Sequence, residues 1–332
     1  MKAVSFDRYG EPRDVLGVTD LPVPEPGPGQ VRLRIRLSPV NPSDLLYVRG
    51  HYSGVEEHFP SGAGFESVSI VDKLGPGVEG LTVGQRVFAH NPDGGNWAQY
   101  AVVPTLLVWP VPDDIPDEQA AGFMINPATA ILMVRHVLAV PAGSWLLQTA
   151  AGSELGRMII RLARHDGIRT LNVVRRPEAV GELKNLGADE VIVSTDGPID
   201  EQVRKIVGEA GVDHALDPVA GPTGTEVFRS LSENGRMLLY GSLTGQGISV
   251  GADPRLTLSG RRTLEVFWLG YWLPRLSQLG LTMAGLIEEM STLIRAGVLE
   301  NSPGERFGLE EVVAAVVEAE AVGRKGKVLI VP

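Results

Sequence analysis

The residues between Ala150 and Gly156 could hold a phosphate group. They read Ala-Ala-Gly-Ser-Glu-Leu-Gly and lie between a short apolar run, 145–149, and a predicted helix. Small residues let the backbone approach a pyrophosphate, and the free N–H groups at a helix start bind its charge. Two glycines of the pattern G-x-G-x-x-G are replaced, by Ala151 and Ser153, so an ordinary strand-to-helix turn is the alternative. The residues expected to contact a dinucleotide are Gly152, Ser153, Leu155 and Gly156.

Two arginines, Arg175 and Arg176, follow the next predicted strand, Thr170–Val174. An acidic residue at this place would bind a ribose 2′-OH, whereas guanidinium groups bind a 2′-phosphate through bidentate, charge-assisted hydrogen bonds. The alternative interpretation is a solvated pair of charges at a helix start. The pair favours NADPH over NADH as the cofactor.

A tyrosine, Tyr52, follows a short predicted helix with clearly marked ends. Asn41 can cap this helix, Pro42 suits its first position, and Asp44 places negative charge in its first turn. Gly50 is expected to end it. The tyrosine is therefore held at a fixed place, either for packing or for chemistry.

The elements that position these residues change in kind along the chain. The segment Val31–Leu37 alternates apolar and polar residues, as a half-buried strand does. Further strands are predicted at 67–71, 84–89 and 97–103, so the first third should be an antiparallel β domain. From about Pro116, predicted helices alternate with buried strands, which is typical of βαβ units and a doubly wound parallel sheet. A last strand in 326–331 should return to the first domain.

Composition restricts the class of protein. The chain has 332 residues, enough for two domains, with 43% hydrophobic and 21% charged residues. Its net charge is −10 and it has no run of five basic residues, which argues against a nucleic-acid or membrane-surface partner. It contains no cysteine, and its N-terminal residues do not read as a signal peptide. No window approaches the length of a bilayer-spanning segment. We expect a cytoplasmic location.

Several motifs carry a resemblance to a known family. They are the segments 62–66 (GAGFE), 74–78 (LGPGV), 84–87 (GQRV), the turn at 150–156, and 186–192 (LGADEVI). With them the chain resembles, over essentially its full length, the medium-chain dehydrogenase/reductase superfamily in its zinc-independent branch. It is most similar to the mitochondrial type of 2-enoyl thioester reductase. The segments that carry this closer likeness are 41–44 (NPSD), 50–52 (GHY), 126–130 (NPATA), 172–175 (NVVR) and 267–272 (FWLGYW).

The resemblance implies an α/β fold of two domains. A GroES-like antiparallel β domain is expected at 1–118 and 268–332, and a Rossmann domain that binds NADPH at 119–267. Zinc-dependent relatives have a cysteine where this chain has Asn41 and a histidine where it has Phe65. With both ligands gone, and no cysteine to replace them, no metal site is expected.

The resemblance also implies a reaction. We expect an NADPH-dependent reductase of activated C=C bonds, with Tyr52 as the hydrogen-bond or proton donor and Asn41 as a second catalytic residue. Helix capping is the alternative role for Asn41. The substrate would be a small molecule: an enoyl thioester, carried on CoA or on a carrier protein, an enone, or a quinone. The alternatives are an NADPH:quinone oxidoreductase and a catalytically silent NADPH-binding protein.

Further cofactor contacts are expected outside the turn. Asn126 and Thr129 begin a predicted helix, where capping is the alternative role, and Lys327 is either a phosphate ligand or a solvated charge. Glu154 departs from the family pattern by placing a carboxylate near the expected pyrophosphate. The apolar segment 264–272 suits a homodimer contact. The remaining expected contacts are Tyr240, Gly241, Phe267 and Trp268.

Overall fold

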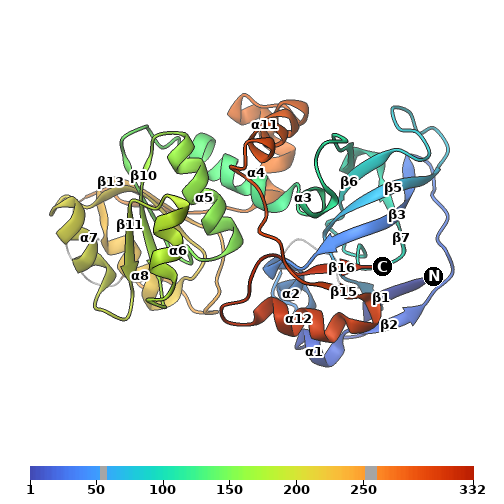
Figure 1. Ribbon diagram of the computed structural model, residues 1–332, viewed down its shortest axis with the longest axis horizontal. Helices are drawn as coiled ribbons and strands as arrows, with labels where there is room; N and C mark the ends of the chain where they lie inside the picture. Colours follow the sequence, from blue (N-terminus) through green and yellow to red (C-terminus); the bar gives the residue numbers. More distant parts are fainter. Residues whose placement is uncertain (53–57, 251–259) are drawn as a thin grey trace. The chain divides into compact units, whose positions relative to one another are not determined.

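The chain passes between two structural units after Ile125 and after Leu299. The computed structural model describes residues 1–52, 58–250 and 260–332 (Figure 1). Unit 1 comprises residues 1–125 and 300–332, and unit 2 comprises residues 126–299. The sequence had predicted boundaries at 118/119 and 267/268. The segment 268–299, expected in the first domain, therefore belongs to unit 2.

The reason for this difference is that the segment packs within unit 2. Its helix α11 (Met283–Arg295) carries Glu289, whose carboxylate lies 2.5 Å from the Arg135 guanidinium. Further along, the carbonyl of Val298 accepts a hydrogen bond of 2.9 Å from the Arg161 Nε. Neither partner could be identified from local sequence, because each lies more than a hundred residues away.

Unit 1 is built on β3, whose apolar and charged residues alternate as predicted. Val31, Leu33 and Ile35 are buried in a core with β5, β6 and β7. The strands are β1 (Lys2–Phe6), β2 (Gly17–Asp20), β3 (Gln30–Pro39), β4 (Ser61–Gly62), β5 (Glu66–Leu74), β6 (Arg86–His90), β7 (Tyr100–Pro104), β8 (Val108–Pro110), β15 (Arg306–Gly308) and β16 (Leu329–Val331). They form a sheet of seven, β15-β16-β3-β5-β6-β8 with β7 also on β3, and a sheet of three, β2-β1-β4. Pairing is antiparallel except between β15 and β16.

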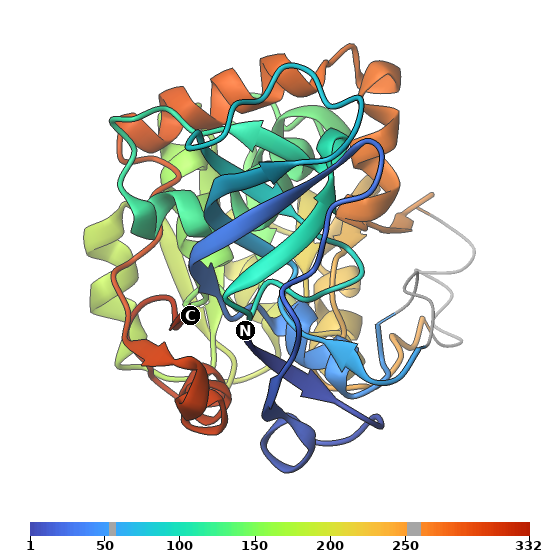
Figure 2. The same cartoon turned by 90° about the vertical axis from the view of Figure 1, so that its right-hand side faces the viewer.

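The end of the chain returns to unit 1, as predicted. β16 pairs with β3 between Leu329 and Pro39 and between Ile330 and Ser38. The red C-terminal segment comes back to the blue N-terminal region, where α12 lies beside α1 (Figures 1 and 2). The helices and 3-10 turns of this unit are α1 (Pro12–Val15), α2 (Pro42–Val48), η1 (Thr105–Leu107), α3 (Asp117–Ala121), η4 (Leu309–Glu311) and α12 (Val312–Glu320).

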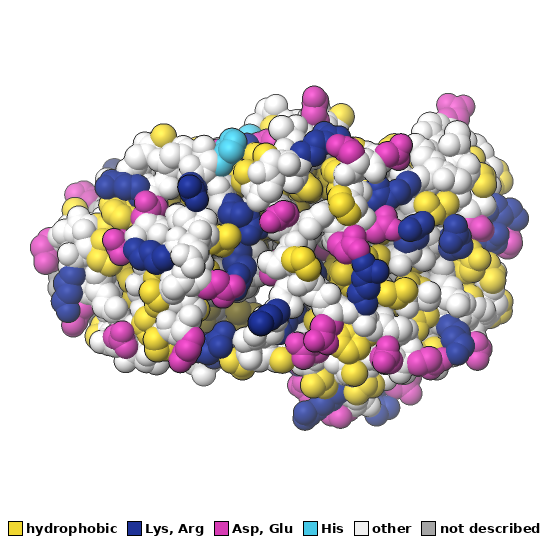
Figure 3. Space-filling view, in the orientation of Figure 1, with side chains coloured by type: hydrophobic (Ala, Val, Ile, Leu, Met, Phe, Trp, Pro, Cys, Tyr) yellow, Lys and Arg dark blue, Asp and Glu magenta, His cyan; other side chains and the backbone are white. Residues whose placement is uncertain are grey.

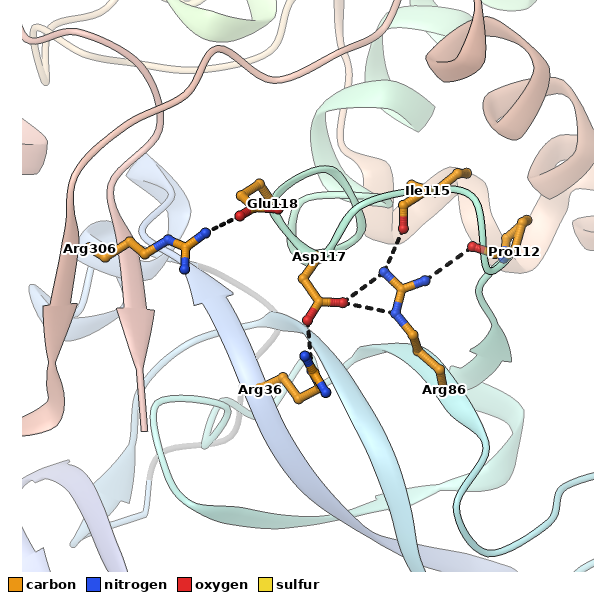
Figure 4. A network of polar contacts seen from close by, with 7 residues as sticks. All are labelled: Arg36, Arg86, Pro112, Ile115, Asp117, Glu118 and Arg306. Atoms are coloured by element: carbon orange, nitrogen blue, oxygen red, sulfur yellow. Dashed lines mark hydrogen bonds and ion pairs between the residues drawn. The ribbon is translucent and has the colours of Figure 1, made fainter.

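A polar network fastens α3 to the sheet of unit 1 (Figure 4). Asp117, the first residue of α3, accepts hydrogen bonds from Arg36 of β3 at 2.6 Å and from Arg86 of β6 at 2.8 Å. Arg86 also donates to the carbonyls of Pro112 and Ile115. One carboxylate thus holds two strands and the segment before α3 in place.

Unit 2 is a six-stranded parallel sheet in the order β11-β10-β9-β12-β13-β14. Its strands are β9 (Trp145–Gln148), β10 (Arg169–Val174), β11 (Glu190–Val193), β12 (Val212–Asp217), β13 (Leu231–Leu239) and β14 (Thr263–Val266). Its helices and helical turns are α4 (Ile125–Ile131), which begins at the last residue of unit 1, η2 (Leu132–Val137), α5 (Glu154–His165), α6 (Ala179–Leu186), α7 (Ile199–Val207), α8 (Gly221–Arg229), α10 (Leu269–Trp272), η3 (Leu273–Leu279) and α11. The predicted doubly wound sheet is confirmed.

Two hydrophobic clusters cover this sheet. One joins α5 and α6 to β10 and β11 through residues such as Ile160 and Leu183. The other joins α7 and α8 to β9, β10, β12 and β13 through residues such as Val203 and Phe228. The strand order reverses at β9, with β10 on one side and β12 on the other, and ligands bind at the carboxyl ends of the strands at such a point.

Candidate functional site

Four polar side chains are buried together in unit 1. Asn41 precedes α2, Asp44 lies in its first turn, Glu66 begins β5, and Lys327 precedes β16. Their exposed fractions are 1%, 0%, 1% and 3%. Buried charges occur where they are paired or hydrogen-bonded, so each of these groups needs partners.

The partners come largely from within this group, called here the polar cluster. Asp44 accepts hydrogen bonds from the backbone N–H of Asn41 at 2.7 Å and of Phe65 at 2.9 Å. Glu66 accepts from the Asn41 side-chain amide at 2.9 Å and from the Ile125 N–H at 3.0 Å. The ammonium of Lys327 donates to the Asn41 side-chain oxygen. The Asp44 carboxylate therefore closes the start of α2, while the Asn41 side chain, expected to cap it, contacts Glu66 and Lys327.

Burial governs the charges of the cluster. It raises the pKa of Asp44 to about 7, with a further rise from the charge of Glu66, while the Asn41 and Phe65 N–H groups and Lys327 lower it. Burial also raises the pKa of Glu66, although the charge of Lys327 acts against it. The cluster thus holds two carboxyl groups beside one ammonium.

Tyr52 lies next to this cluster through Phe65. Gly50, at φ +74°, follows the end of α2 as predicted, and Tyr52 comes two residues later. The half-buried ring of Tyr52 lies 5.2 Å from the ring of Phe65, centroid to centroid, and Phe65 lies 5.4 Å from Tyr47. One side of the Tyr52 ring thus packs on an aromatic platform whose backbone is held by Asp44.

The predicted phosphate turn in unit 2 has the expected geometry. Ser153 caps α5, and its side chain accepts a hydrogen bond from the Gly156 N–H at 3.1 Å. A Cβ at Gly156 would lie 2.7 Å from the Ala151 Cα, so the helix start packs directly on the turn. A Cβ at Gly152 would meet nothing within 4 Å, which leaves space at the turn. Glu154 is buried in the first turn of α5, and its charge raises the pKa of Arg157 together with that of Glu182.

Arg175 and Arg176 are exposed directly after β10. Among the described residues, neither guanidinium takes part in a hydrogen bond or an ion pair. Asp189 accepts a hydrogen bond of 2.8 Å from the N–H of Thr170, at the opposite end of that strand. At the carboxyl end of β10 the available side chains are therefore cationic.

Other predicted cofactor residues also follow the carboxyl ends of parallel strands. Tyr240 and Gly241 follow β13, and Phe267 and Trp268 follow β14. The Tyr240 hydroxyl is buried and has no hydrogen-bond partner among the described residues. An orphan hydroxyl at this edge can bond a ligand.

The remaining predicted contacts lie on α4 and in the polar cluster. Thr129 is buried and Asn126 is half-buried on α4, which begins at Ile125, one residue before the predicted start. Lys327, expected at a phosphate or in solvent, is buried on Asn41. The prediction that these residues contact a cofactor stays a prediction.

Sequence reasoning missed Glu66 as a site residue. A charged residue at the start of the predicted buried strand 67–71 was the available signal, because such a charge must find a buried partner. Sequence reasoning also missed Asp217 at the end of β12, whose carboxylate accepts hydrogen bonds from Thr149 and from the N–H groups of Val219 and Ala220.

Three other features of the described residues complete the survey of possible sites. No three His, Asp or Glu side chains among them are grouped so as to hold a metal ion. A hollow of about 630 Å³ in unit 1 runs beside β1 and β2, and neither Tyr52 nor the polar cluster lines it. In the part of the chain that the structure describes, no helix has both the length and the apolar character needed to cross a bilayer.

Comparisons with known proteins agree with this architecture. Residues 27–113 match the family described as alcohol dehydrogenase GroES-like domain, and residues 155–284 match zinc-binding dehydrogenase. The human mitochondrial enoyl-[acyl-carrier-protein] reductase is 31% identical over 276 residues, which cover 82% of this chain and 73% of the human protein.

Solved structures are similar over the whole chain. The putative NADPH:quinone reductase from Bacillus thuringiensis superposes with a TM-score of 0.90 at 28% identity, covering 100% of this chain and 98% of that protein. A mycobacterial protein solved with NADPH superposes with a TM-score of 0.88 at 27% identity, covering 100% of both chains.

Proposed function

The chain belongs to the medium-chain dehydrogenase/reductase superfamily, in its zinc-independent branch, and on that premise we propose that it is an NADPH-dependent reductase of activated carbon–carbon double bonds. The substrate class we favour is the 2-enoyl thioester. The observation that carries the proposal is the placement of Tyr52 on the Phe65 platform in a chain related to enoyl reductases.

The residues of unit 2 suit NADPH. The free N–H groups at the start of α5 and the open space at Gly152 fit a pyrophosphate. Arg175 and Arg176, without partners among the described residues, suit the 2′-phosphate. The orphan hydroxyl of Tyr240 suits a polar group of the same ligand. The other residues proposed to hold NADPH are Asn126, Thr129, Ser153, Leu155, Gly156, Gly241, Phe267 and Trp268.

When bound, NADPH supplies the hydride. The β-carbon of the substrate accepts it, the α-carbon takes a proton, and the double bond becomes a single bond. During this step negative charge develops on the carbonyl oxygen, and a hydrogen bond to that oxygen stabilises the transition state more than the ground state. We assign this hydrogen bond, or the proton itself, to the Tyr52 hydroxyl, and we place Asn41 beside it as the residue that fixes the local geometry.

The first test measures NADPH oxidation with a trans-2-enoyl-CoA for the wild type and for Tyr52→Phe. Loss of a positioned proton donor should lower kcat at least about tenfold, while folding is unchanged. Tyr100→Phe is the matched control, because this half-buried tyrosine of β7 lies in the same unit and its ring, 5.8 Å from the Arg32 guanidinium carbon, is kept. Turnover by Tyr52→Phe equal to that of the control would contradict the assignment.

A quinone is the second substrate class to test. The proteins similar in structure include a putative NADPH:quinone reductase, and that reaction needs the same cofactor residues but no proton donor at an α-carbon. Turnover of a simple quinone alone, insensitive to Tyr52→Phe, would keep the cofactor assignment and replace the substrate assignment.

We also propose a homodimer formed through the edge strand β14 of unit 2. Val266 on this strand is 77% exposed, and the nearby Tyr271 and Leu243 are exposed as well. Because an open, apolar strand edge pairs readily with a second copy, its burial in a dimer is favourable. Light scattering of the purified protein should give twice the chain mass of 35.5 kDa, and a monomer would remove this proposal.

A further inference from the structure

Lys327 is a buried cation that has no part in the reaction steps described above. Its side chain is 3% exposed, and an isolated ammonium at such a place would be strongly destabilising. It donates a hydrogen bond to the Asn41 side-chain oxygen, and its charge lowers the pKa values of Asp44 and Glu66 against the effect of burial. It is thus the cationic member of the polar cluster.

The backbone of unit 1 fixes where this lysine lies. Its N–H donates to the Ser302 carbonyl at 3.1 Å, and the next residue, Val328, accepts from the Val40 N–H at 2.9 Å. A Cβ at Gly304 would lie 2.0 Å from the Lys327 carbonyl oxygen, so only glycine allows these two segments to pack. Main-chain packing therefore fixes the point of the backbone from which the Lys327 side chain reaches Asn41.

The ammonium determines the orientation of the Asn41 amide. A lysine can only donate hydrogen bonds and an ionised carboxylate can only accept them. Between Lys327 and Glu66, Asn41 must therefore turn its oxygen to the lysine and its NH₂ group to the glutamate, which is the arrangement found. Without the lysine, only the contact with Glu66 defines the orientation of the Asn41 amide.

From Asn41 the contacts lead to Tyr52. The Asn41 backbone N–H and the Phe65 N–H donate to the two oxygens of the same Asp44 carboxylate. The ring of Phe65 then lies against the ring of Tyr52. Val328, next to the lysine, is in the same hydrophobic cluster as Phe65 and Tyr47.

We propose that Lys327 is a positioning residue for Tyr52: its ammonium orients the Asn41 amide beside the carboxyl groups of Asp44 and Glu66, and so holds Phe65 as the platform of the Tyr52 ring. The link to catalysis rests on the proposed function. The link to Phe65 does not, and can be measured without any substrate.

The experiment compares Lys327→Met with the double variant Lys327→Met/Glu66→Gln. The single variant removes the only cation of the polar cluster from beside two buried carboxyl groups, and its Tm should fall by on the order of 10 °C. The double variant removes one of those carboxylates, so it should recover most of the Tm. An amide at position 66 can donate as well as accept, so the Asn41 amide stays without a fixed orientation.

The proposal therefore predicts that stability and activity separate. In the double variant kcat should remain about ten- to a hundredfold below wild type with little change in KM, as expected for a misplaced catalytic group. Hydrogen exchange at the Asn41 and Phe65 amides should be faster than in the wild type, while amides of β6 in the same unit are unchanged. Lys2→Met is the matched control, because Lys2 pairs with Glu310 at the surface of unit 1.

Two results would overturn the proposal. A double variant that recovers both Tm and kcat would show that Lys327 only balances charge. Unchanged exchange at Phe65 would show that the lysine does not hold the platform, whatever the activity. If the wild type reduces no enoyl substrate, the proposed function fails, and the exchange measurement still decides whether Lys327 positions Phe65.

Discussion

Asp44 shows how a single buried carboxyl group makes stability depend on pH. Its pKa is raised to about 7, chiefly by burial, against an ordinary value of 3.8. The folded state therefore holds a proton on Asp44 that the unfolded state releases, so the contribution of this group to the free energy of unfolding falls as pH rises between about pH 4 and 7. The largest slope that one group can give is about 1.4 kcal/mol per pH unit.

Asp44→Asn should reduce this slope. Glu66, whose pKa is raised in the same direction, keeps its share, so the slope should become smaller without vanishing. Urea unfolding at half-unit steps from pH 4 to 7 measures it. Asp7→Asn, at an exposed aspartate of the same unit, is the control and should leave the slope unchanged. Equal slopes in both variants would contradict the role given to Asp44.

For single residues, the sequence predicted local backbone features better than it predicted tertiary contacts. The helix marked by Asn41, Pro42 and Gly50 is confirmed, because caps and helix stops act over a few residues. The place of Lys327 could not be predicted, because its partner Asn41 lies 286 residues away and no local pattern encodes that contact.

Among the elements, the start of α5 depends on close packing against its own turn. A Cβ at Gly156 would lie 2.7 Å from both the Cα and the carbonyl oxygen of Ala151. Gly156→Ala should therefore destabilise the fold by about 1–3 kcal/mol, since the backbone must shift. Gly181→Ala in α6, where a Cβ meets nothing within 4 Å, should instead be neutral or stabilising by up to about 1 kcal/mol.

Denaturant unfolding of the two alanine variants gives this comparison directly. Equal stability of both would mean that the turn relaxes without cost, and the packing argument for Gly156 would fail.

The strands and helices themselves were largely predicted, because period-2 and period-3.6 patterns are local. The membership of α11 was not, because it depends on the distant ion pair of Glu289 with Arg135.

For the whole molecule, binding of a ligand can be measured as an increase in the free energy of unfolding. NADPH at a hundred times its Kd should raise the free energy of unfolding by about 2.7 kcal/mol, since it binds only the folded state. The double variant Arg175→Ala/Arg176→Ala should reduce the stabilisation by NADPH to about the stabilisation that NADH gives. Arg169→Ala is the control, because this arginine lies on Trp145 at the other end of β10.

Thermal unfolding with each nucleotide measures the effect. Stabilisation by NADPH that persists in the arginine double variant would place the 2′-phosphate elsewhere.

On the face shown in Figure 3, basic and acidic side chains are interspersed and form no continuous basic band. On this face, attraction of a phosphate depends on individual basic residues.

The two crossings of the chain have a consequence for how the protein is made. Residues 126–299 form one uninterrupted unit, whereas unit 1 needs both 1–125 and 300–332. During translation, unit 2 can fold as soon as it leaves the ribosome. Unit 1 must wait, with Ser38 and Pro39 at the end of β3 lacking their strand partner and with Asp44 and Glu66 lacking their cation, until Lys327 and β16 emerge. In the nascent chain, the segment synthesised first is thus the one completed last.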